Sequence, residues 1–370
     1  MNAETRPPPV RPEAQRWSTR LALSPRFHRL AARIPGLRGL VRREGEALFS
    51  LVCGFVQSQA LVALVEARVL HQLAHGPMTP EDLSRRCALP PAALTVLMRA
   101  GAALRLVSAD RNRRWHLAPR GAAFLTVPGL EPMVRHHHVL YRDLADPLAF
   151  FRGETETGLA GFWPYVFGPL AREDAALAAR YSRLMAESQV LVAEDTLRLV
   201  DLSRRNRLLD VGGGTGAFLA EVGKAHPGLS LSLFDMPAVL DAVPERLRNR
   251  LVLHPGDFRA DPLPEGADTI SLVRVLYDHP DEVVTALLAK VRAALPPGGM
   301  ILVSEPMSGG DRPDPATDVY FAIYTLAMRT GRTRSAAEIA ALLQAAGFGS
   351  IRQRPGDRPF VTSVVTGVRH

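Results

Sequence analysis

Leu208-Leu-Asp-Val-Gly-Gly-Gly-Thr-Gly-Ala-Phe-Leu219 begins as an apolar strand and ends as the start of a helix, with four glycines between them. Glycine adopts positive φ angles and lets a ligand approach the backbone where a Cβ would block it. A strand, a glycine-rich turn and a helix N-terminus together form a nucleotide or nucleoside site at the carboxyl edge of a doubly wound sheet. The stretch therefore predicts such a site at Gly212, Gly214 and Gly216. We expect Asp210 to meet a positive ligand group there.

The glycine spacing alone does not identify the ligand, because Gly212-x-Gly214-x-x-Ala217 also fits the dinucleotide fingerprint. Asp235 follows the next predicted strand, Leu229–Phe234, and an acid at that place binds the ribose hydroxyls of either cofactor. The acid ahead of the glycines and the Gly-x-Gly-x-Gly spacing favour S-adenosylmethionine. A nicotinamide-dependent oxidoreductase remains the alternative.

Gly256-Asp257-Phe258 follows the third predicted strand, Leu251–Leu253. A Gly-Asp-Phe sequence at that place resembles the turn that holds the adenine ring in methyltransferases. This resemblance favours a methyltransferase over a dehydrogenase and makes Asp257 and Phe258 candidate cofactor-binding residues.

Strands and helices alternate along the rest of the chain, which specifies a mostly parallel sheet. Further strands are predicted at Thr269–Leu276, Met300–Ser304, Ser350–Gln353 and Phe360–Val368. Helices are predicted at Asp281–Leu295, Ala316–Arg329 and Ser335–Ala346. The carboxyl ends of parallel strands meet at one edge of the sheet. We therefore expect one active site at that edge, containing Asp210, Asp235, Asp257, Tyr277 and Glu305.

The part of the chain ahead of this sheet predicts a winged-helix module. A long, nearly all-round apolar helix is expected over Glu46–His75, buried in a dimer interface, and a second helix starts after Thr79, which suits an N-cap. A third helix from Pro91 and a hairpin around residues 108–114 follow. Because the third helix offers little that reads base edges, we expect it to serve packing and dimerisation, with no nucleic acid as partner. A winged-helix DNA-binding regulator remains the alternative.

The basic charge of the chain is concentrated at its front. The 370 residues carry a formal charge of +8, and residues 1–43 hold ten arginines and two glutamates, which already account for +8. Apolar residues are mixed with these arginines, and no signal-peptide pattern is present in the segment. We expect a partly ordered extension, with attachment to an anionic membrane surface as the sharper alternative. Cys53 and Cys87 have no metal or redox spacing, which indicates a reducing, cytoplasmic location.

The segment between the winged helix and the sheet is rich in histidine and aromatic residues. Adjacent residues of a helix point in different directions, so we expect His136-His137-His138 to bind no metal. Phe150, Phe151, Phe162, Trp163, Tyr165 and Phe167 suit either a core or a hydrophobic substrate pocket, since pockets form between domains. The predicted parts are a basic extension (1–45), a winged-helix dimerisation domain (46–130), a helical substrate-pocket segment (131–200) and a cofactor-binding methyltransferase domain (201–370).

These motifs resemble the two-domain small-molecule O-methyltransferases of the plant-caffeate type, from Glu46 to the end of the chain. The matching motifs are Asp-Val-Gly-Gly-Gly-Thr-Gly, Phe-Asp-Met-Pro around Asp235, Gly-Asp-Phe, and Arg-Val-Leu-Tyr-Asp-His-Pro-Asp-Glu from Arg274. The resemblance implies an α/β Rossmann-like domain behind a winged-helix domain that forms a homodimer. It implies S-adenosylmethionine as cofactor, S-adenosylhomocysteine as product, and cofactor contacts at Met236, Arg274 and Met185, which with Tyr181 matches the family's Phe-x-x-x-Met.

The chain departs from this family at the catalytic motif. Tyr277 occupies the position of the usual catalytic histidine, and His279 stands where tryptophan is usual. Glu305 matches the first of two glutamates that orient the histidine, and Thr333 stands in place of the second. Tyr277 or His279 is expected to relay a proton. Of the two, a neutral His279 has the better-suited pKa, at about 7. The alternatives are that the alcohol loses its proton as the methyl group arrives, with proximity dominating, or that His279 only packs.

Two segments resemble a narrower group, the carotenoid 1-hydroxy O-methyltransferases of photosynthetic bacteria. They are residues 136–147 and Phe162-Trp-Pro-Tyr-Val166, and the group also has Tyr-Asp-His replacements of the catalytic motif. The resemblance implies methyl transfer to the tertiary C-1 hydroxyl of an acyclic carotenoid, a hydrophobic substrate reached from the cytoplasmic face of the photosynthetic membrane. A bacteriochlorophyll pigment or a polyketide remains the alternative substrate.

Overall fold

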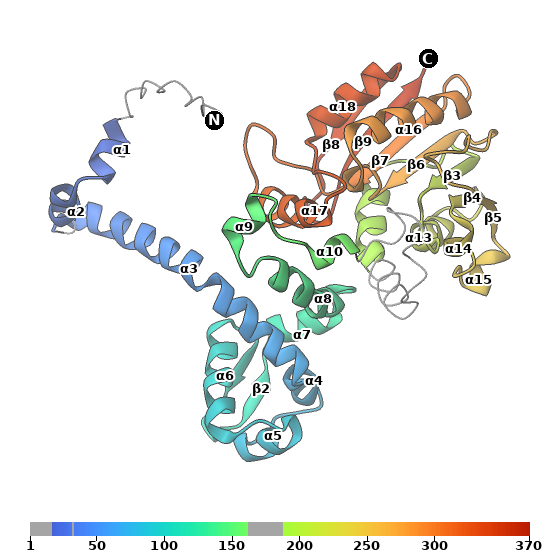
Figure 1. Ribbon diagram of the computed structural model, residues 1–370. Helices are drawn as coiled ribbons and strands as arrows, with labels where there is room; N and C mark the ends of the chain where they lie inside the picture. Colours follow the sequence, from blue (N-terminus) through green and yellow to red (C-terminus); the bar gives the residue numbers. More distant parts are fainter. Residues whose placement is uncertain (1–16, 32, 162–187) are drawn as a thin grey trace, which may run out of the picture. The chain divides into compact units, whose positions relative to one another are not determined.

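The chain forms two compact units, residues 1–118 and 119–370, in a computed structural model that describes residues 17–31, 33–161 and 188–370. Figure 1 shows the central sheet within the second unit, with the strands carrying the yellow-to-red end of the colour scale. Tyr181, Met185 and the aromatic residues predicted between 162 and 167 lie outside the described residues. The domain boundaries at 46, 131 and 201 stay a prediction.

The first unit consists of six helices and one hairpin among its described residues. The helices are α1 (Trp17–Ala22), α2 (Pro25–Ala31), α3 (Pro35–Glu66), α4 (Val69–Ala74), α5 (Pro80–Cys87) and α6 (Pro91–Ala103). Strands β1 (Val107–Ala109) and β2 (Trp115–Leu117) pair antiparallel and form the expected wing. The Thr79 Oγ1 accepts a hydrogen bond from the Asp82 N–H at 3.2 Å, so the predicted N-cap of α5 is confirmed.

The long apolar helix differs from the prediction at both ends. It begins at Pro35 instead of Glu46, inside the predicted extension, and it ends at Glu66. Arg68 has a φ of +55°, a left-handed conformation that no α-helix continues. The chain turns there, and α4 buries Val69 and Leu70 in the core of the first unit.

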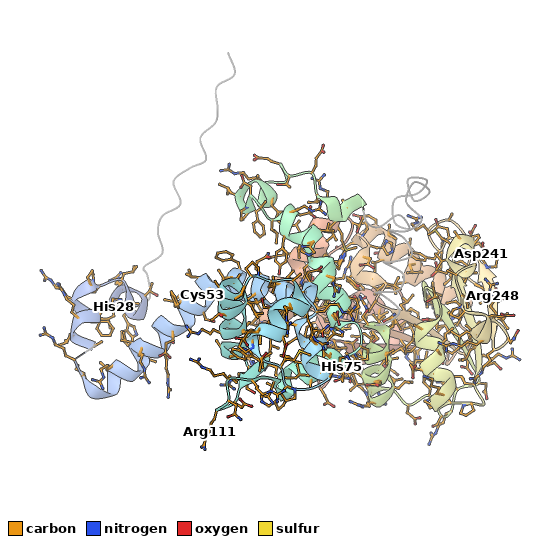
Figure 2. The ribbon with its side chains drawn as sticks, turned by 90° about the horizontal axis from the view of Figure 1, so that it is seen from below. His28, Cys53, His75, Arg111, Asp241 and Arg248 are labelled. Carbon is orange, nitrogen blue, oxygen red and sulfur yellow. The ribbon has the colours of Figure 1, made fainter. Side chains whose placement is uncertain are left out.

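Helix α3 is buried only near its C-terminal end. Val62, Leu64 and Val65 are at most 5% exposed, whereas the half around Cys53 carries apolar side chains that stand out from the helix (Figure 2). Those exposed at more than half of their area are Leu48, Phe49, Leu51, Val52, Phe55 and Val56. Among the described residues, this is the one helix with the length and hydropathy of a membrane span. An apolar surface of this extent marks a contact with a partner.

The second unit surrounds a seven-stranded sheet with helices. The strands are β3 (Arg207–Val211), β4 (Ser230–Asp235), β5 (Leu251–Pro255), β6 (Thr269–Val273), β7 (Met300–Glu305), β8 (Phe348–Arg354) and β9 (Ser363–Arg369). The helices are α7 (Pro119–Thr126), α8 (Leu130–Asp143), α9 (Pro147–Phe151), α10 (Gly158–Gly161), a helix at 188–199, α13 (Ala217–Ala225), α14 (Pro237–Leu240), α15 (Glu245–Arg248), α16 (Asp281–Ala294), α17 (Ala322–Met328) and α18 (Ala336–Ala345).

The strand order is β5-β4-β3-β6-β7-β9-β8. The first five strands in this order are parallel, and β9 lies between β7 and β8 and is antiparallel to both. Strands β6 and β7 are buried along their whole length, as parallel strands covered by helices on both faces are. One apolar cluster contains Leu287 and Leu343 of α16 and α18, and another contains Phe218 and Leu219 of α13. The predicted doubly wound α/β fold is confirmed.

Strand β6 is shorter than the apolar run that encodes it. The sequence predicts a strand to Leu276, but β6 ends at Val273 because Arg274 has a φ of +59°. The chain then forms the 3₁₀ turn η2 (Leu276–Asp278), which buries Tyr277 instead of extending the sheet. The helix predicted at 316–329 also differs, because it starts as the π-helix η3 (Pro315–Phe321) before α17. Both departures lie beside the expected active site.

Candidate functional site

The glycine loop lies between β3 and α13. Gly212, Gly214 and Gly216 have φ angles of +69°, +62° and +80°, which other residues rarely adopt. The Gly212 N–H donates to the Phe234 carbonyl at 2.9 Å, so the loop continues the β3–β4 ladder before it turns. At Gly213 the φ angle is ordinary, but a Cβ would lie 2.2 Å from Oδ2 of Asp210. The predicted turn is therefore confirmed, and one glycine in it is required by close packing.

Asp210 lies beneath this loop and is 0% exposed. Its Oδ1 accepts a hydrogen bond from the Ser271 Oγ at 2.6 Å, and its Oδ2 has no partner among the described residues. Burial raises the pKa of Asp210 to about 7, since the charged form loses its hydration. The carboxyl therefore supports the loop from inside, and a direct contact with a positive ligand group stays a prediction.

Asp235 holds the loop from the neighbouring strand. Its Oδ2 accepts from the Gly214 N–H at 2.8 Å and its Oδ1 accepts from the Met236 N–H at 2.7 Å. Burial raises the pKa of Asp235 to about 6, and the two N–H bonds act against that rise. Each carboxylate oxygen has a second lone pair, so Asp235 keeps acceptor capacity for ligand hydroxyls. The geometry suits the predicted ribose contact.

A turn after β5 carries Asp257 and Phe258. The Arg259 guanidinium binds the Asp257 carboxylate, with Nη2 to Oδ2 at 2.8 Å, and this bond lowers the pKa of Asp257. Lys290 of α16 closes the turn, because its Nζ donates to the carbonyls of Phe258 and Asp261 at 2.8 Å each and to that of Arg259 at 3.1 Å. The half-buried Phe258 ring is thus held on a rigid turn, as a flat partner for adenine requires.

Tyr277 and Arg274 face one another beyond the end of β6. The Arg274 Nη2 donates to the Tyr277 hydroxyl at 3.3 Å, and its Nη1 donates to the Ser188 Oγ at 2.7 Å. Tyr277 is 3% exposed, and burial raises its pKa well above the ordinary value in spite of Arg274. Tyr277 is therefore neutral at physiological pH and available as a hydrogen-bonding group, and its expected role as a proton relay stays a prediction.

His279 points to a different neighbour. Its ring packs edge-on against Phe258, with centroids 5.2 Å apart and an interplanar angle of 85°. Burial, together with the charges of Arg259 and Arg334, lowers the pKa of His279 to about 4. The imidazole is therefore neutral, and the structure brings it to the turn expected to hold adenine. Its expected role as a proton relay stays a prediction.

Glu305 contacts the backbone of η2. Its Oε2 accepts hydrogen bonds from the N–H groups of Leu276 at 3.0 Å and Tyr277 at 3.3 Å, and its Oε1 has no partner among the described residues. Burial raises the pKa of Glu305 to about 7, against those two bonds and two nearby arginines. Glu305 therefore positions the turn that carries Tyr277. It acts on the main chain, whereas the resemblance implied the orientation of a side chain.

Glu305→Gln is expected to gain stability relative to the wild type as the pH rises. The folded protein keeps the Glu305 carboxyl protonated up to about pH 7, whereas the unfolded chain releases that proton near 4.5. The stability contributed by this group is therefore full below pH 4.5 and is lost as the pH rises to 7. Because glutamine does not titrate, the free energy of unfolding should shift in favour of the variant by up to about 3 kcal/mol.

Urea unfolding of both proteins without cofactor, at pH 5 and pH 8 and one protein concentration, measures this difference. A difference that is the same at both pH values would show that Glu305 is ionised throughout.

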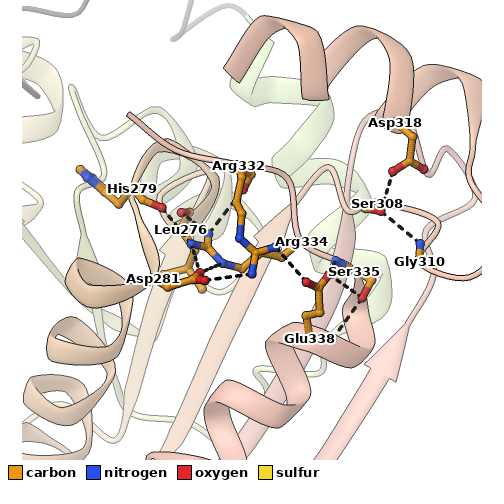
Figure 3. A network of polar contacts seen from close by, with 10 residues as sticks. All are labelled: Leu276, His279, Asp281, Ser308, Gly310, Asp318, Arg332, Arg334, Ser335 and Glu338. Carbon is orange, nitrogen blue, oxygen red and sulfur yellow. Dashed lines mark hydrogen bonds and ion pairs between the residues drawn. The ribbon is translucent and has the colours of Figure 1, made fainter. Parts of the chain in front are cut away.

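Arg334 is a residue that the sequence reasoning missed. It is 0% exposed and joins three parts of the segment that follows β6, as Figure 3 shows. Its Nη1 donates to the Leu276 carbonyl at 2.8 Å, and its Nη2 donates to the His279 carbonyl at 2.9 Å. The same guanidinium binds Oδ1 of Asp281, with Nε at 2.8 Å and Nη2 at 2.6 Å. We name this arrangement the Arg334 clamp. It fixes the backbone on both sides of Tyr277.

Gly331, in the segment ahead of α18, lies against the backbone of Tyr277. A Cβ at Gly331 would lie 2.0 Å from the Tyr277 carbonyl oxygen and 2.6 Å from the His279 nitrogen. The family resemblance puts Thr333 at the position of the second glutamate. The close approach at Gly331 leaves no room for a side chain between this segment and η2.

Two histidines of α8 pair with two tyrosines. The His136 Nε2 lies 2.9 Å from the Tyr324 hydroxyl, and the His137 Nε2 lies 2.8 Å from the Tyr320 hydroxyl. No group of three histidine, cysteine or acidic side chains suited to a metal ion occurs in the described part of the chain. The histidine run therefore contributes to a polar cluster with two aromatic hydroxyls.

Comparison with known families gives two matches along the chain. Residues 49–127 match the O-methyltransferase dimerisation domain, and residues 141–349 match the O-methyltransferase domain. The demethylspheroidene O-methyltransferase of Rhodobacter capsulatus is 60% identical over 361 residues, which cover 98% of this chain and 91% of that protein. The demethylspheroidene O-methyltransferase of Cereibacter sphaeroides is 59% identical over 359 residues, covering 96% of this chain and 95% of that protein.

Among solved structures, the chain is similar to CalO1, a methyltransferase in calicheamicin biosynthesis, in its SAH-bound form. The two share 27% identity and a TM-score of 0.71, with 89% of this chain and 98% of CalO1 covered.

Proposed function

Since this chain belongs to the family of S-adenosylmethionine-dependent O-methyltransferases with a dimerisation domain, we propose that it methylates the tertiary C-1 hydroxyl of an acyclic hydroxycarotenoid. The observation that carries the substrate is the identity of about 60%, over nearly the full chain, with two demethylspheroidene O-methyltransferases. The family decides between the cofactors that the glycine spacing left open, in favour of S-adenosylmethionine. It also supports a homodimer.

The residues present fit this cofactor. The glycine loop leaves space for a ligand at Gly214, where a Cβ would meet nothing within 4 Å, and Asp235 keeps acceptor capacity beside it. When bound, the cofactor supplies an electrophilic methyl group on a sulfonium. We assign Gly212, Gly214 and Gly216 to close backbone approach, Asp235 to the ribose hydroxyls, and Asp257 and Phe258 to adenine. Asp210, Met236 and Arg274 complete the proposed cofactor site among the described residues, and Met185, which lies outside them, is assigned to it by the family resemblance alone.

We place Tyr277 on the side of the active site that binds the substrate hydroxyl, which we call the hydroxyl-binding side. Its neutral hydroxyl, held by Arg274, donates to or accepts from the substrate alcohol and orients it. Glu305 and the Arg334 clamp keep this tyrosine in place through the backbone. A tertiary alcohol is a very weak acid, so it gives up its proton as the methyl group arrives, and positioning supplies much of the rate. His279 stays neutral beside Phe258.

We further propose that α1 and α2 contact the cytoplasmic surface of a membrane, where such a substrate resides. Trp17, Leu23 and Leu30 are 59–76% exposed, and Arg20, Arg26 and Arg29 lie between them in the sequence. Arginines attract anionic lipids, and exposed apolar side chains insert at the interface. Sedimentation with vesicles tests this contact. Binding that is no stronger to anionic than to neutral vesicles contradicts it.

A methyl-transfer assay with labelled S-adenosylmethionine tests the substrate. Detergent-dispersed 1-hydroxy acyclic carotenoids, a bacteriochlorophyll pigment, an aromatic polyketide and small phenols are compared at equal concentration. We expect label in the carotenoid, as a methyl ether at C-1. Label confined to another class would retain the methyltransferase activity and overturn the carotenoid assignment.

A further inference from the structure

The pair of His137 and Tyr320 lies in the same unit as the proposed hydroxyl-binding side. The His137 Nε2 and the Tyr320 hydroxyl are 2.8 Å apart, within hydrogen-bond distance, and the two rings are tilted by 60°. The Tyr320 ring stacks on that of Tyr324, which pairs with His136 in the same way. His136 and Tyr324 are at most 8% exposed, whereas His137 and Tyr320 are only partly buried. The outer pair is therefore the one accessible to a ligand.

The backbone that carries Tyr320 is unusual. Tyr320 lies in the π-helix η3, a conformation that is rare and occurs often at functional sites. Asp314 caps this helix by accepting from the N–H groups of Ala316 and Thr317 at 2.9 and 3.0 Å. Helix α17, which continues η3, packs against η2 and against α8. The elements that carry Tyr277, Tyr320 and His137 thus form one packed group.

The methyl transfer needs an acceptor for the alcohol proton. The position of the family's catalytic histidine holds Tyr277, whose hydroxyl accepts from Arg274, a cation that cannot take a proton onward. The His279 ring packs on Phe258, the residue that we assign to adenine. Burial raises the pKa of Tyr320 as well as that of Tyr277, but the Tyr320 hydroxyl has an imidazole as its partner. A second imidazole, that of His137 on α8, is hydrogen-bonded to the Tyr320 hydroxyl in the same packed group of helices.

We propose that Tyr320 and His137 accept the proton of the substrate hydroxyl. This inference rests on the proposed function. As the alcohol oxygen forms its bond to the methyl carbon, the C–S bond of the cofactor breaks and its electron pair stays on sulfur. The alcohol proton passes to the Tyr320 oxygen, and the Tyr320 proton passes to the His137 Nε2. The positive charge lost at sulfur appears on the imidazolium, which then releases the proton to water.

The surroundings of His137 keep it ready to accept a proton. Burial lowers the pKa of His137, and the neighbouring His138 lowers it further, so the imidazole is neutral at physiological pH. The other titratable groups around it are Tyr141 on α8, Tyr324 on α17, and Arg274 and Tyr277, which act on Tyr320. Helix α7 brings Arg120, and α10 (Gly-Leu-Ala-Gly) brings no titratable side chain. A proton on His137 therefore remains only briefly.

His137→Gln and Tyr320→Phe test the pair, with Tyr324→Phe as the matched control. The first two variants are expected to lower kcat by about 100-fold or more, the range for loss of a general base. They should also remove the decline of kcat on the acid side of the pH profile, because that decline reports protonation of His137. Affinity for S-adenosylhomocysteine, measured by titration, should stay unchanged. Tyr324→Phe should keep the wild-type pH profile.

A measurement without substrate tests the pair independently of the reaction. Nitrogen NMR of the histidine rings should show His137 protonated at Nδ1, with Nε2 accepting from Tyr320, and Tyr320→Phe should shift the Nε2 resonance. An Nε2-protonated His137, or a wild-type pH profile in His137→Gln, overturns the inference. If the wild type leaves the carotenoid unmethylated, the proposed function fails, and the same variants are compared on the substrate class that the assay identifies.

Discussion

Gly213→Ala is expected to remove measurable binding of S-adenosylmethionine. The added Cβ would lie 2.2 Å from Oδ2 and 2.8 Å from Cγ of Asp210, and 2.7 Å from Cδ1 of Leu233. All three atoms belong to buried side chains of the central strands, so none of them has room to move away. The loop must move instead, and with it the N–H of Gly214 that donates to Asp235. We expect at least a 100-fold loss of affinity, which corresponds to about 3 kcal/mol.

Gly228→Ala provides the control for Gly213→Ala. Gly228 follows α13 in the same unit, has no positive φ, and a Cβ there would meet nothing within 4 Å. Titration calorimetry with S-adenosylhomocysteine compares the two variants, and circular dichroism checks that both are folded. Wild-type affinity in folded Gly213→Ala would mean that the loop and Asp210 are not packed as described.

Arg334→Met is expected to destabilise the protein by about 2–5 kcal/mol, because two buried carbonyls lose their donors at about 1–3 kcal/mol each. The carbonyls of Leu276 and His279 lose donors in an interior that water does not reach. Asp281 loses two bonds to the same guanidinium. Because these atoms flank Tyr277, the turn should also shift, and kcat should fall more than the affinity for the cofactor.

Arg332→Met is the matched control, since Arg332 binds Asp281 at 3.0 Å and Glu338 at 2.8 Å but its side chain is 47% exposed. Exposed ion pairs contribute about 0–1 kcal/mol, so its loss should be small. Urea unfolding at a fixed protein concentration measures both variants. Equal destabilisation by the two substitutions would contradict the special role of the buried arginine.

Local sequence patterns predicted most of the sheet. The glycine loop, the strands around it and the cap at Thr79 depend on residues close together in the chain, so their patterns are visible without a structure. The end of β6 was not predictable in this way. Val275 and Leu276 continue the apolar run, and only the left-handed Arg274, held by Ser188 and Tyr277, interrupts the strand.

The residues that were missed act over long sequence separations. Arg334 lies 58 residues from Leu276 and 55 from His279, and no short motif links them. His137 and Tyr320 are 183 residues apart, so no local pattern indicates that this histidine has a tyrosine partner. The four-residue spacing of Tyr320 and Tyr324 was a usable signal, since it places both on one helical face.

Lys290 gives the protein a built-in chemical probe. The chain contains two lysines, and the Lys290 amine is engaged by three carbonyls of the turn that carries Phe258, whereas Lys224 is 68% exposed. Acylating reagents attack the unprotonated amine. Lys224, on the surface and bound to the single carboxylate of Glu221 at 2.6 Å, reacts faster than Lys290, which must first leave three carbonyls as the turn opens. The ratio of the two labelled peptides, read by mass spectrometry, therefore reports the opening of the proposed adenine-binding turn in the wild-type protein, with no substitution needed.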